Sequence, residues 1–200
     1  MKLFLHINAK KIETVISYFD NYLWNVGIQI RKLFNRKTQM DFLKENGLKV
    51  GKECYIWSEE GIDALFPFLI EIGDYVTIST NVRILAHDNS TYKQNLHTKI
   101  GRVYIGNYVF IGNGVTILPN VHIGNNTIIG ANSLVSKDLP PNGVYAGNPA
   151  RYICSIEDYK NKHLEGLKTH PVYKYKRPFS DEQKEQMKMD LENTYGYYYK

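Results

Sequence analysis

The middle of the chain carries a branched aliphatic residue at every sixth position. Six of them follow one another at a constant step: Ile105, Ile111, Ile117, Ile123, Ile129 and Val135. An earlier run keeps the same step at Ile72, Ile78 and Ile84. Four positions after most of these lies a second small or branched residue: Val76, Val82, Val109, Val115, Val121, Thr127 and Ser133. A six-residue step fits neither an α-helix nor a simple alternating hairpin, so the pattern predicts short strands joined by tight turns.

Such strands and turns can wind into a coil with three faces, one face for each six-residue repeat. Glycine directly follows five of the nine aliphatics: Gly73, Gly106, Gly112, Gly124 and Gly130. A glycine there permits either a positive φ or a close approach of two backbones. Stacked coils would pair their strands in parallel and form an inner column of Ile and Val. Residues 105–140 predict two full coils and residues 72–87 most of another, whereas an antiparallel sandwich would show turn signals every 8–12 residues.

The segments on either side of the repeat predict helices and two interruptions. Apolar residues recur at helical spacing at Ile12, Val15, Ile16 and Phe19. A second helix is expected over residues 38–45, with Thr38 and Asp41 as its N-terminal cap and Gly47 as its end. We expect residues 1–47 to form a helical cap over the open end of the coil, which would otherwise expose a sheet edge. Residues 48–56 then read as the first coil, and residues 57–69 as an irregular excursion.

The second interruption is a long loop over residues 85–102, within a coil domain that spans residues 48–153. Long loops that leave a regular solenoid tend to carry function, and this one holds His87 and His97. Residues 154–200 form a tail rich in Tyr, Lys and acidic residues. In this tail, Ser180 and Gln183 form a capping-box pattern that predicts a helix to about residue 191.

Composition narrows the possible classes of protein. With 200 residues, 43% hydrophobic and 22% charged, the chain is expected to fold as a globular protein. Two cysteines, Cys54 and Cys154, exclude a disulfide framework and a zinc ribbon. We expect no signal peptide, no membrane span and a cytoplasmic location. Residues 72–151 hold six Lys or Arg and three Asp or Glu, so most of the net charge of +5 lies on the coil.

At residues 103–153, which begin VYIGNYVFIGNG and end GNPARYI, the sequence resembles the hexapeptide-repeat acyltransferases. The resemblance covers about residues 48–153 and is to the branch of maltose/galactoside, streptogramin and polysaccharide O-acetyltransferases. It implies a mainly β fold, a left-handed parallel β-helix, with the helical cap and the tail added at its ends. It also implies a homotrimer, with acetyl-CoA lying along a groove between coils of adjacent subunits.

His87 is the candidate catalytic residue. Transfer of an acyl group from a thioester to a hydroxyl needs a base that is neutral near pH 7 and can later protonate the leaving thiolate. In the family this histidine stands where the long loop leaves the coil, and His87 in ILAHDNS holds that place. Asp88 is a candidate to bind the acceptor or to help hold the imidazole, and a solvated loop acid is the equal alternative. His97 is a candidate contact of the acceptor or CoA, and a surface loop residue without a role is the favoured alternative. His122 is expected to face outward in a structural role.

The resemblance also assigns residues to the donor. Phe110 stands where the family usually has Trp, beside the thioester arm, and Asn113 and Ala131 match positions that line the pantetheine channel. Ser136 and Lys137 match the pair that reaches the phosphates of CoA, and Arg151 matches a basic residue near the nucleotide. The family's further basic residue is Cys154 here. The amino-terminal segment that shapes the family's acceptor pocket does not match residues 1–47.

The sequence thus predicts an acetyl-CoA-dependent O-acetyltransferase acting on a small-molecule sugar or a polysaccharide precursor, by direct transfer in a ternary complex. Alternatives are an antibiotic acetyltransferase, an N-acetyltransferase of an amino-sugar nucleotide and a catalytically silent scaffold. Zinc ligation of the kind seen in γ-class carbonic anhydrases is not expected, because His97 and His122 are 25 positions apart and no second histidine lies near His122. Nucleic-acid binding is not expected either, since only Lys174–Arg177 mixes basic and aromatic residues.

Overall fold

The computed structural model describes residues 37–94 and 97–199. The chain divides into two compact units, Met1–Glu45 and Asn46–Lys200. In the first unit, α2 (Gln39–Glu45) begins after Thr38, as predicted. The Thr38 hydroxyl accepts the N–H of Asp41 at 3.1 Å, and the Asp41 carboxylate accepts the N–H of Thr38 at 2.9 Å. The helix expected around residues 12–19 lies outside the described residues, and the role of residues 1–47 as a cap remains a prediction.

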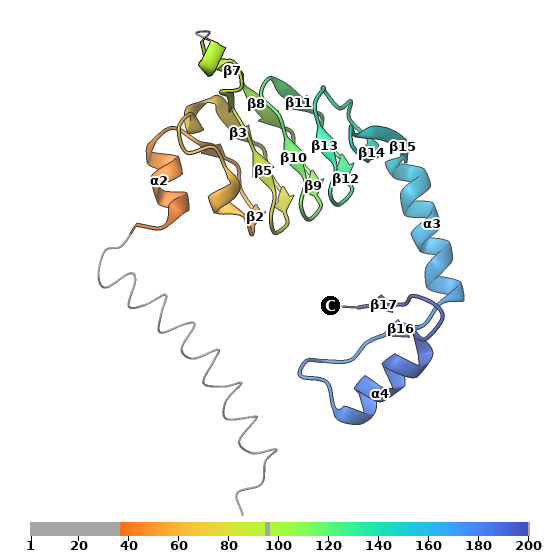
Figure 1. Cartoon of the computed structure of the whole chain (residues 1–200). Coiled ribbons are helices and arrows are strands. Elements are labelled where there is room, and N and C mark those ends of the chain that lie inside the picture. Colours follow the sequence, from red (N-terminus) through yellow and green to blue (C-terminus); the bar gives the residue numbers. More distant parts are fainter. Residues whose placement is uncertain (1–36, 95–96, 200) are drawn as a thin grey trace, which may run out of the picture. The chain divides into compact units, whose positions relative to one another are not determined.

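The second unit is built around a coil with three faces, each a sheet of short parallel strands (Figure 1). The first face contains β1 (Lys49–Val50), β3 (Ile70–Ile72), β8 (Val103–Ile105) and β11 (Val121–Ile123). The second face contains β2 (Tyr55–Ile56), β4 (Thr77–Ile78), β9 (Phe110–Ile111), β12 (Ile128–Ile129) and β14 (Gly143–Ala146). The third face contains β5 (Arg83–Ile84), β10 (Thr116–Ile117) and β13 (Leu134–Val135). Strands that are neighbours in the chain therefore belong to different faces, which is the architecture of a β-helix.

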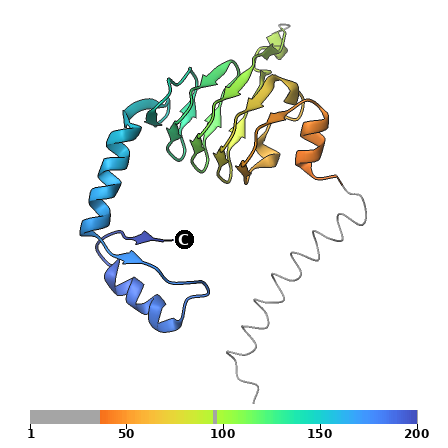
Figure 2. The same cartoon turned by 180° about the vertical axis from the view of Figure 1, so that it is seen from behind.

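The six-residue period sets the register of this coil. Phe110 pairs with Ile128 and Thr116 with Leu134, so each strand of these coils lies against the strand three repeats later. Figure 2 shows the same stack from behind. All nine predicted aliphatics are buried in one column: Ile72, Ile78, Ile84, Ile105, Ile111, Ile117, Ile123, Ile129 and Val135. The predicted core is thereby confirmed.

The glycines of the repeat serve close packing, while asparagine and tyrosine make the turns. The N–H of Gly112 donates to the Ile129 carbonyl of the next coil at 2.9 Å. A Cβ on Gly112 would lie 2.7 Å from the backbone nitrogen of Ala131, which is too close for two adjacent coils. The left-handed φ values fall instead at corner residues such as Tyr75, Asn81, Tyr108, Asn120, Asn126 and Asn132. Of the two roles open to these glycines, Gly112 therefore takes the close approach.

Both interruptions of the repeat leave the coil and return to it. Residues 57–69 include the 3-10 turns η1 (Glu59–Gly61) and η2 (Pro67–Leu69), yet Ile62 between them forms a parallel bridge with Ile84 of the third face. The second interruption contains an antiparallel hairpin of β6 (His87–Asp88) and β7 (Lys99–Ile100), with η3 (Tyr92–Gln94) between the strands. The first interruption thus continues the coil at one residue, and the second projects from it.

The chain leaves the coil through β15 (Arg151–Ser155), which pairs antiparallel with β14 and covers the edge of the second face. A helix that the sequence analysis did not predict follows, α3 (Ile156–Thr169), with Ser155 as its N-cap. Beyond it, β16 (Val172–Tyr173) pairs in parallel with β17 (Tyr197–Tyr198). Between these strands lies α4 (Asp181–Asp190), where the predicted capping box of Ser180 and Gln183 is present. No helix within residues 37–94 and 97–199 is long and apolar enough to span a membrane.

Replacing one residue of the inner column tests the role of the repeat. Ile117→Ala removes a fully buried side chain, and we expect it to lower the free energy of unfolding by about 2–5 kcal/mol. Thr116→Ala, one position earlier on β10, changes a side chain outside the column and serves as the control. Urea unfolding followed by circular dichroism measures both. Equal losses of stability in the two variants would contradict the assignment of the column as the core.

Candidate active site

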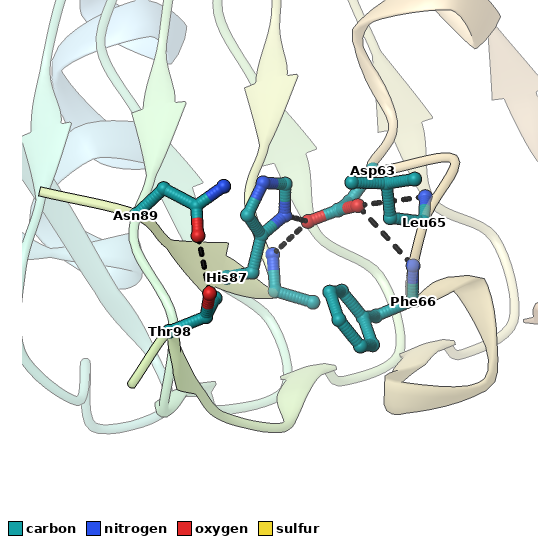
Figure 3. Close-up of polar contacts among 7 residues, drawn as sticks. Asp63, Leu65, Phe66, His87, Asn89 and Thr98 are labelled. Atoms are coloured by element: carbon teal, nitrogen blue, oxygen red, sulfur yellow. Dashed lines mark hydrogen bonds and ion pairs between the residues drawn. The ribbon is translucent and has the colours of Figure 1, made fainter. Parts of the chain in front are cut away.

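His87 lies at the start of the projecting hairpin, three residues after β5 ends the third face of its coil. Its Nδ1 atom is 2.5 Å from Oδ2 of Asp63, and Figure 3 shows the two side chains pointing toward each other. Asp63 reaches this place because Ile62 bridges Ile84, and the N–H of Asp63 donates to the Ile84 carbonyl at 2.9 Å. The coil register therefore places an aspartate from one coil beside a histidine of the next.

The Asp63 carboxylate is buried and fully hydrogen-bonded. Its side chain is only 1% exposed, and its two oxygens accept four hydrogen bonds. Oδ2 accepts from Nδ1 of His87 and from the backbone N–H of Ala86. Oδ1 accepts from the backbone N–H groups of Leu65 and Phe66. Burial by itself raises the pKa of this carboxyl, but the bonds from His87, Ala86 and Leu65 outweigh it and hold the pKa below its usual value of 3.8. Asp63 is therefore an anion that fixes the orientation of the imidazole.

With Nδ1 donating to Asp63, the proton of neutral His87 belongs on Nδ1 and the free lone pair on Nε2. The ring is tilted against the Phe66 ring, with centroids 5.5 Å apart. Figure 3 shows the second ring nitrogen on the side away from Asp63. His87 also lines a cavity of about 430 Å³, whose other walls come from the coil and the hairpin: Leu85, Asp88, Asn89, Lys99, Leu118, Pro119 and Ser136. The imidazole of His87 thus stands at a cavity large enough for a small molecule.

Three residues predicted from the sequence line this cavity: His87, Asp88 and Ser136. Asp88 does not hold the imidazole, because Asp63 occupies Nδ1 and the Asp88 carboxylate accepts the N–H of Ser90 at 2.8 Å. That bond is the main reason why the pKa of the exposed Asp88 carboxyl lies below its usual value. His97 is exposed and does not line the cavity; its carbonyl accepts the Thr91 hydroxyl at 3.1 Å.

The residues assigned to the donor lie along the two edges of the third face and beside it. Asn113 and Ala131 occupy the turns before β10 and β13, where the Asn113 amide donates to the Thr80 hydroxyl and carbonyl. Ser136 and Lys137 follow β13 at the opposite edge, on the cavity side. Phe110 is 45% exposed on β9 of the second face. Arg151 is exposed at the start of β15, and its guanidinium donates to the Ala150 carbonyl. One chain therefore does not gather all of these residues around one cavity.

Asp63 was missed by the sequence analysis. Residues 57–69 read as an irregular excursion because the six-residue rhythm is lost there. The signal in the sequence was Ile62, an aliphatic residue directly before Asp63, which occupies in its coil the place that Ile84 occupies in the next.

His122 faces outward as predicted, and its ring stacks on Tyr104 with centroids 4.7 Å apart.

A metal centre finds no support in the described part of the chain. Residues 37–94 and 97–199 contain no group of three or more His, Cys, Asp or Glu side chains placed to hold an ion. Cys54 and Cys154 are both free thiols, and neither lines the cavity.

The fold and this pair define a class of protein: a β-helix of six-residue repeats that carries a histidine–aspartate pair at one corner of the coil. Comparison with known proteins supports the same class. The family of bacterial transferase hexapeptides (six repeats) matches residues 102–137. Protein CapG of Staphylococcus aureus is 38% identical over 139 residues, which cover 67% of this chain and 81% of CapG.

Two further relatives extend the comparison. YvoF of Bacillus subtilis (strain 168), a candidate acetyltransferase, is 36% identical over 115 residues, covering 58% of this chain and 64% of YvoF. The crystal structure of the hexapeptide-repeat containing acetyltransferase VCA0836 from Vibrio cholerae superposes with a TM-score of 0.50 at 22% identity, over 68% of this chain and 92% of that one. This structure supports the fold alone. The chain belongs to the hexapeptide-repeat acyltransferases.

Asp63→Asn tests the buried pair through the pH dependence of stability. Because the folded pKa of Asp63 is depressed, its ionised form stabilises the protein above the unfolded-state pKa, and this contribution is lost as the pH falls through the folded pKa. We expect wild type to be about 1–3 kcal/mol more stable than Asp63→Asn at pH 7 and the difference to shrink below about pH 4. Urea unfolding at pH 7 and at pH 3 measures the difference in the free energy of unfolding between the two proteins.

Asp88→Asn is the matched control, since the Asp88 carboxyl is exposed and accepts the Ser90 N–H. We expect this variant to change stability by much less than Asp63→Asn at pH 7. A stability difference between wild type and Asp63→Asn that is the same at pH 7 and at pH 3 would show that the Asp63 charge does not stabilise the fold.

Proposed function

We propose that the protein transfers an acetyl group from acetyl-CoA to a hydroxyl of a sugar or polysaccharide precursor, with His87 as the general base. The observation that carries the proposal is the His87–Asp63 pair, which commits Nδ1 to a buried carboxylate and leaves Nε2 for the reaction at the cavity. The similarity to the candidate acetyltransferase YvoF supports the acetyl group as the one transferred.

The proposed reaction is a direct transfer in a ternary complex. His87 Nε2 takes the proton of the acceptor hydroxyl while the hydroxyl oxygen attacks the thioester carbonyl carbon. The tetrahedral intermediate collapses, the carbon–sulfur bond breaks, and the imidazolium returns its proton to the thiolate of CoA. Asp63 stabilises the imidazolium, and its four N–H partners keep it ionised throughout. A covalent cysteine route lacks support, since neither thiol lines the cavity.

We further propose a homotrimer of left-handed β-helices, because the donor residues divide between the two edges of the third face. Ser136 and Lys137 lie on the edge that carries His87, and Asn113 and Ala131 on the other. CoA is a long anionic molecule, and a groove between two copies can bring one edge of each coil together around it. Phe110, exposed on the neighbouring face, would meet the thioester arm there. Acetyl-CoA and two free thiols favour a cytoplasmic location.

His87→Ala tests the proposed role of the base. We expect kcat for acetyl transfer to fall by about 10²–10⁴-fold, which is the usual contribution of general base catalysis. Binding of CoA, measured by calorimetry, should remain, since His87 acts on the acceptor hydroxyl. His122→Ala is the matched control, because His122 is exposed and stacks on Tyr104 outside the cavity. Unchanged turnover in His87→Ala would exclude His87 as the base.

The acceptor class is tested by release of CoA thiol from acetyl-CoA in the presence of single sugars. The panel contains methyl glucoside, methyl galactoside, maltose, N-acetylglucosamine and N-acetylgalactosamine. We expect at least one of these to stimulate thiol release, with the acetyl ester identified by mass spectrometry, and His87→Ala to abolish the stimulation. No stimulation of thiol release by any of these sugars would overturn sugar O-acetylation.

A further inference from the structure

Asn89 stands two positions after His87, where the hairpin continues beyond β6. Asp88, the residue between them, pairs with Lys99 of β7. Asn89 lines the same cavity as His87. Figure 3 shows the nitrogen of its side-chain amide directed toward the imidazole. The base therefore has a polar neighbour that the proposed reaction does not yet use.

The orientation of this amide is fixed at its oxygen end. The Thr98 hydroxyl, from the returning side of the hairpin, donates to Oδ1 of Asn89. The Asn89 carbonyl accepts the N–H of Tyr92 at 3.1 Å, which holds the backbone as well. With the oxygen engaged, the NH2 group projects to the side of the ring that carries Nε2 (Figure 3). Among the described residues, this NH2 group has no hydrogen-bond partner, so it is a donor available at the cavity.

We infer that Asn89 binds the acceptor and selects for an oxygen next to the hydroxyl that is acetylated, with Thr98 as the residue that positions it. The inference rests on the proposed function. An amide NH2 can only donate, so its partner must offer a lone pair, as a vicinal hydroxyl or a ring oxygen does. The cavity also has apolar lining at Leu118 and Pro119. A ring with one C–H face and neighbouring oxygens, the shape of a pyranose, fits both walls.

Asn89→Ala and Asn89→Asp test the contact, using acetyl-CoA and whichever sugar of the panel reacts fastest. We expect Asn89→Ala to lower kcat/KM for the sugar about tenfold, chiefly through a higher KM, as removal of one hydrogen bond does. The KM for acetyl-CoA should not change. Asn89→Asp has nearly the same shape but can only accept, so it should lose activity on sugars whose neighbouring oxygen cannot donate.

Monodeoxy derivatives of the same sugar identify the partner oxygen. Wild type should lose about tenfold in kcat/KM on the derivative that lacks the neighbouring hydroxyl, whereas Asn89→Ala should lose little more on it than on the parent sugar. If the partner is the ring oxygen, the 5-thio analogue should show the same pattern. This pairing of residue and substrate is a double-mutant cycle, which isolates the one interaction.

Thr98→Val supplies the test of positioning. It keeps the shape of the side chain but removes the hydroxyl, and we expect about a threefold loss of kcat/KM for the sugar, which Thr98→Ser restores. Thr91→Val is the matched control, since the Thr91 hydroxyl also ties the loop together, by donating to the His97 carbonyl, but does not touch Asn89. Its kinetics should stay within about twofold of wild type.

Two results for Asn89→Ala would overturn the role of Asn89: wild-type kinetics for the sugar, or a higher KM for acetyl-CoA with an unchanged KM for the sugar. An equal loss of kcat/KM in Thr91→Val and Thr98→Val would overturn the positioning role of Thr98. Failure of the proposed function is a different result, in which wild type transfers acetyl to no sugar or His87→Ala keeps its activity.

Discussion

The stacking of inward aliphatic side chains, one coil upon the next, is the constraint on which the rest of the structure depends. A slip of one residue would turn a whole strand's aliphatics to solvent, so burial of the column fixes the register. Once the register is fixed, residues that follow equivalent strands in neighbouring coils are adjacent in space. Asp63 follows Ile62, and the parallel bridge of Ile62 with Ile84 brings Asp63 against the start of the hairpin. The hydrophobic core thereby determines the geometry of the polar pair.

The buried pair is stable because its charge is compensated locally. An ionised carboxylate without partners would be costly inside the coil. Asp63 instead accepts bonds from Leu65 and Phe66 of its own excursion and from Ala86 and His87 of the next coil. The same bonds tie the excursion of residues 57–69 to the root of the hairpin. A single carboxylate thus stabilises two irregular segments and orients the imidazole, so loss of its charge affects stability and the base together.

Much of the fold followed from local patterns, whereas the site depended on contacts between distant residues. The aliphatic column, the corner that carries His87 and the capping box at Ser180 are signalled by residues within a few positions of each other. Asp63 is 24 residues from His87, in a segment where the repeat is interrupted, so no short-range pattern joined them. Helix α3 was missed although its sequence does carry a local signal: Ile156, Tyr159 and Leu167 recur at helical spacing after the Ser155 cap. The residues assigned to the donor lie on both edges of the third face of one chain, and the proposed trimer would be needed to bring two such edges together.

In the proposed reaction, the base and the groups that would choose the acceptor belong to different parts of the fold. His87 is anchored to the coil through Asp63, whose partners include Ala86 at the foot of the hairpin. Asn89 and Lys99 belong to the hairpin, and the contact of Thr98 with Asn89 holds its two sides together. A change in the hairpin can therefore alter which acceptor binds without displacing Asp63 from His87. In the proposed reaction, the regular coil supplies the chemistry common to the family, and the irregular hairpin supplies the selectivity of this member.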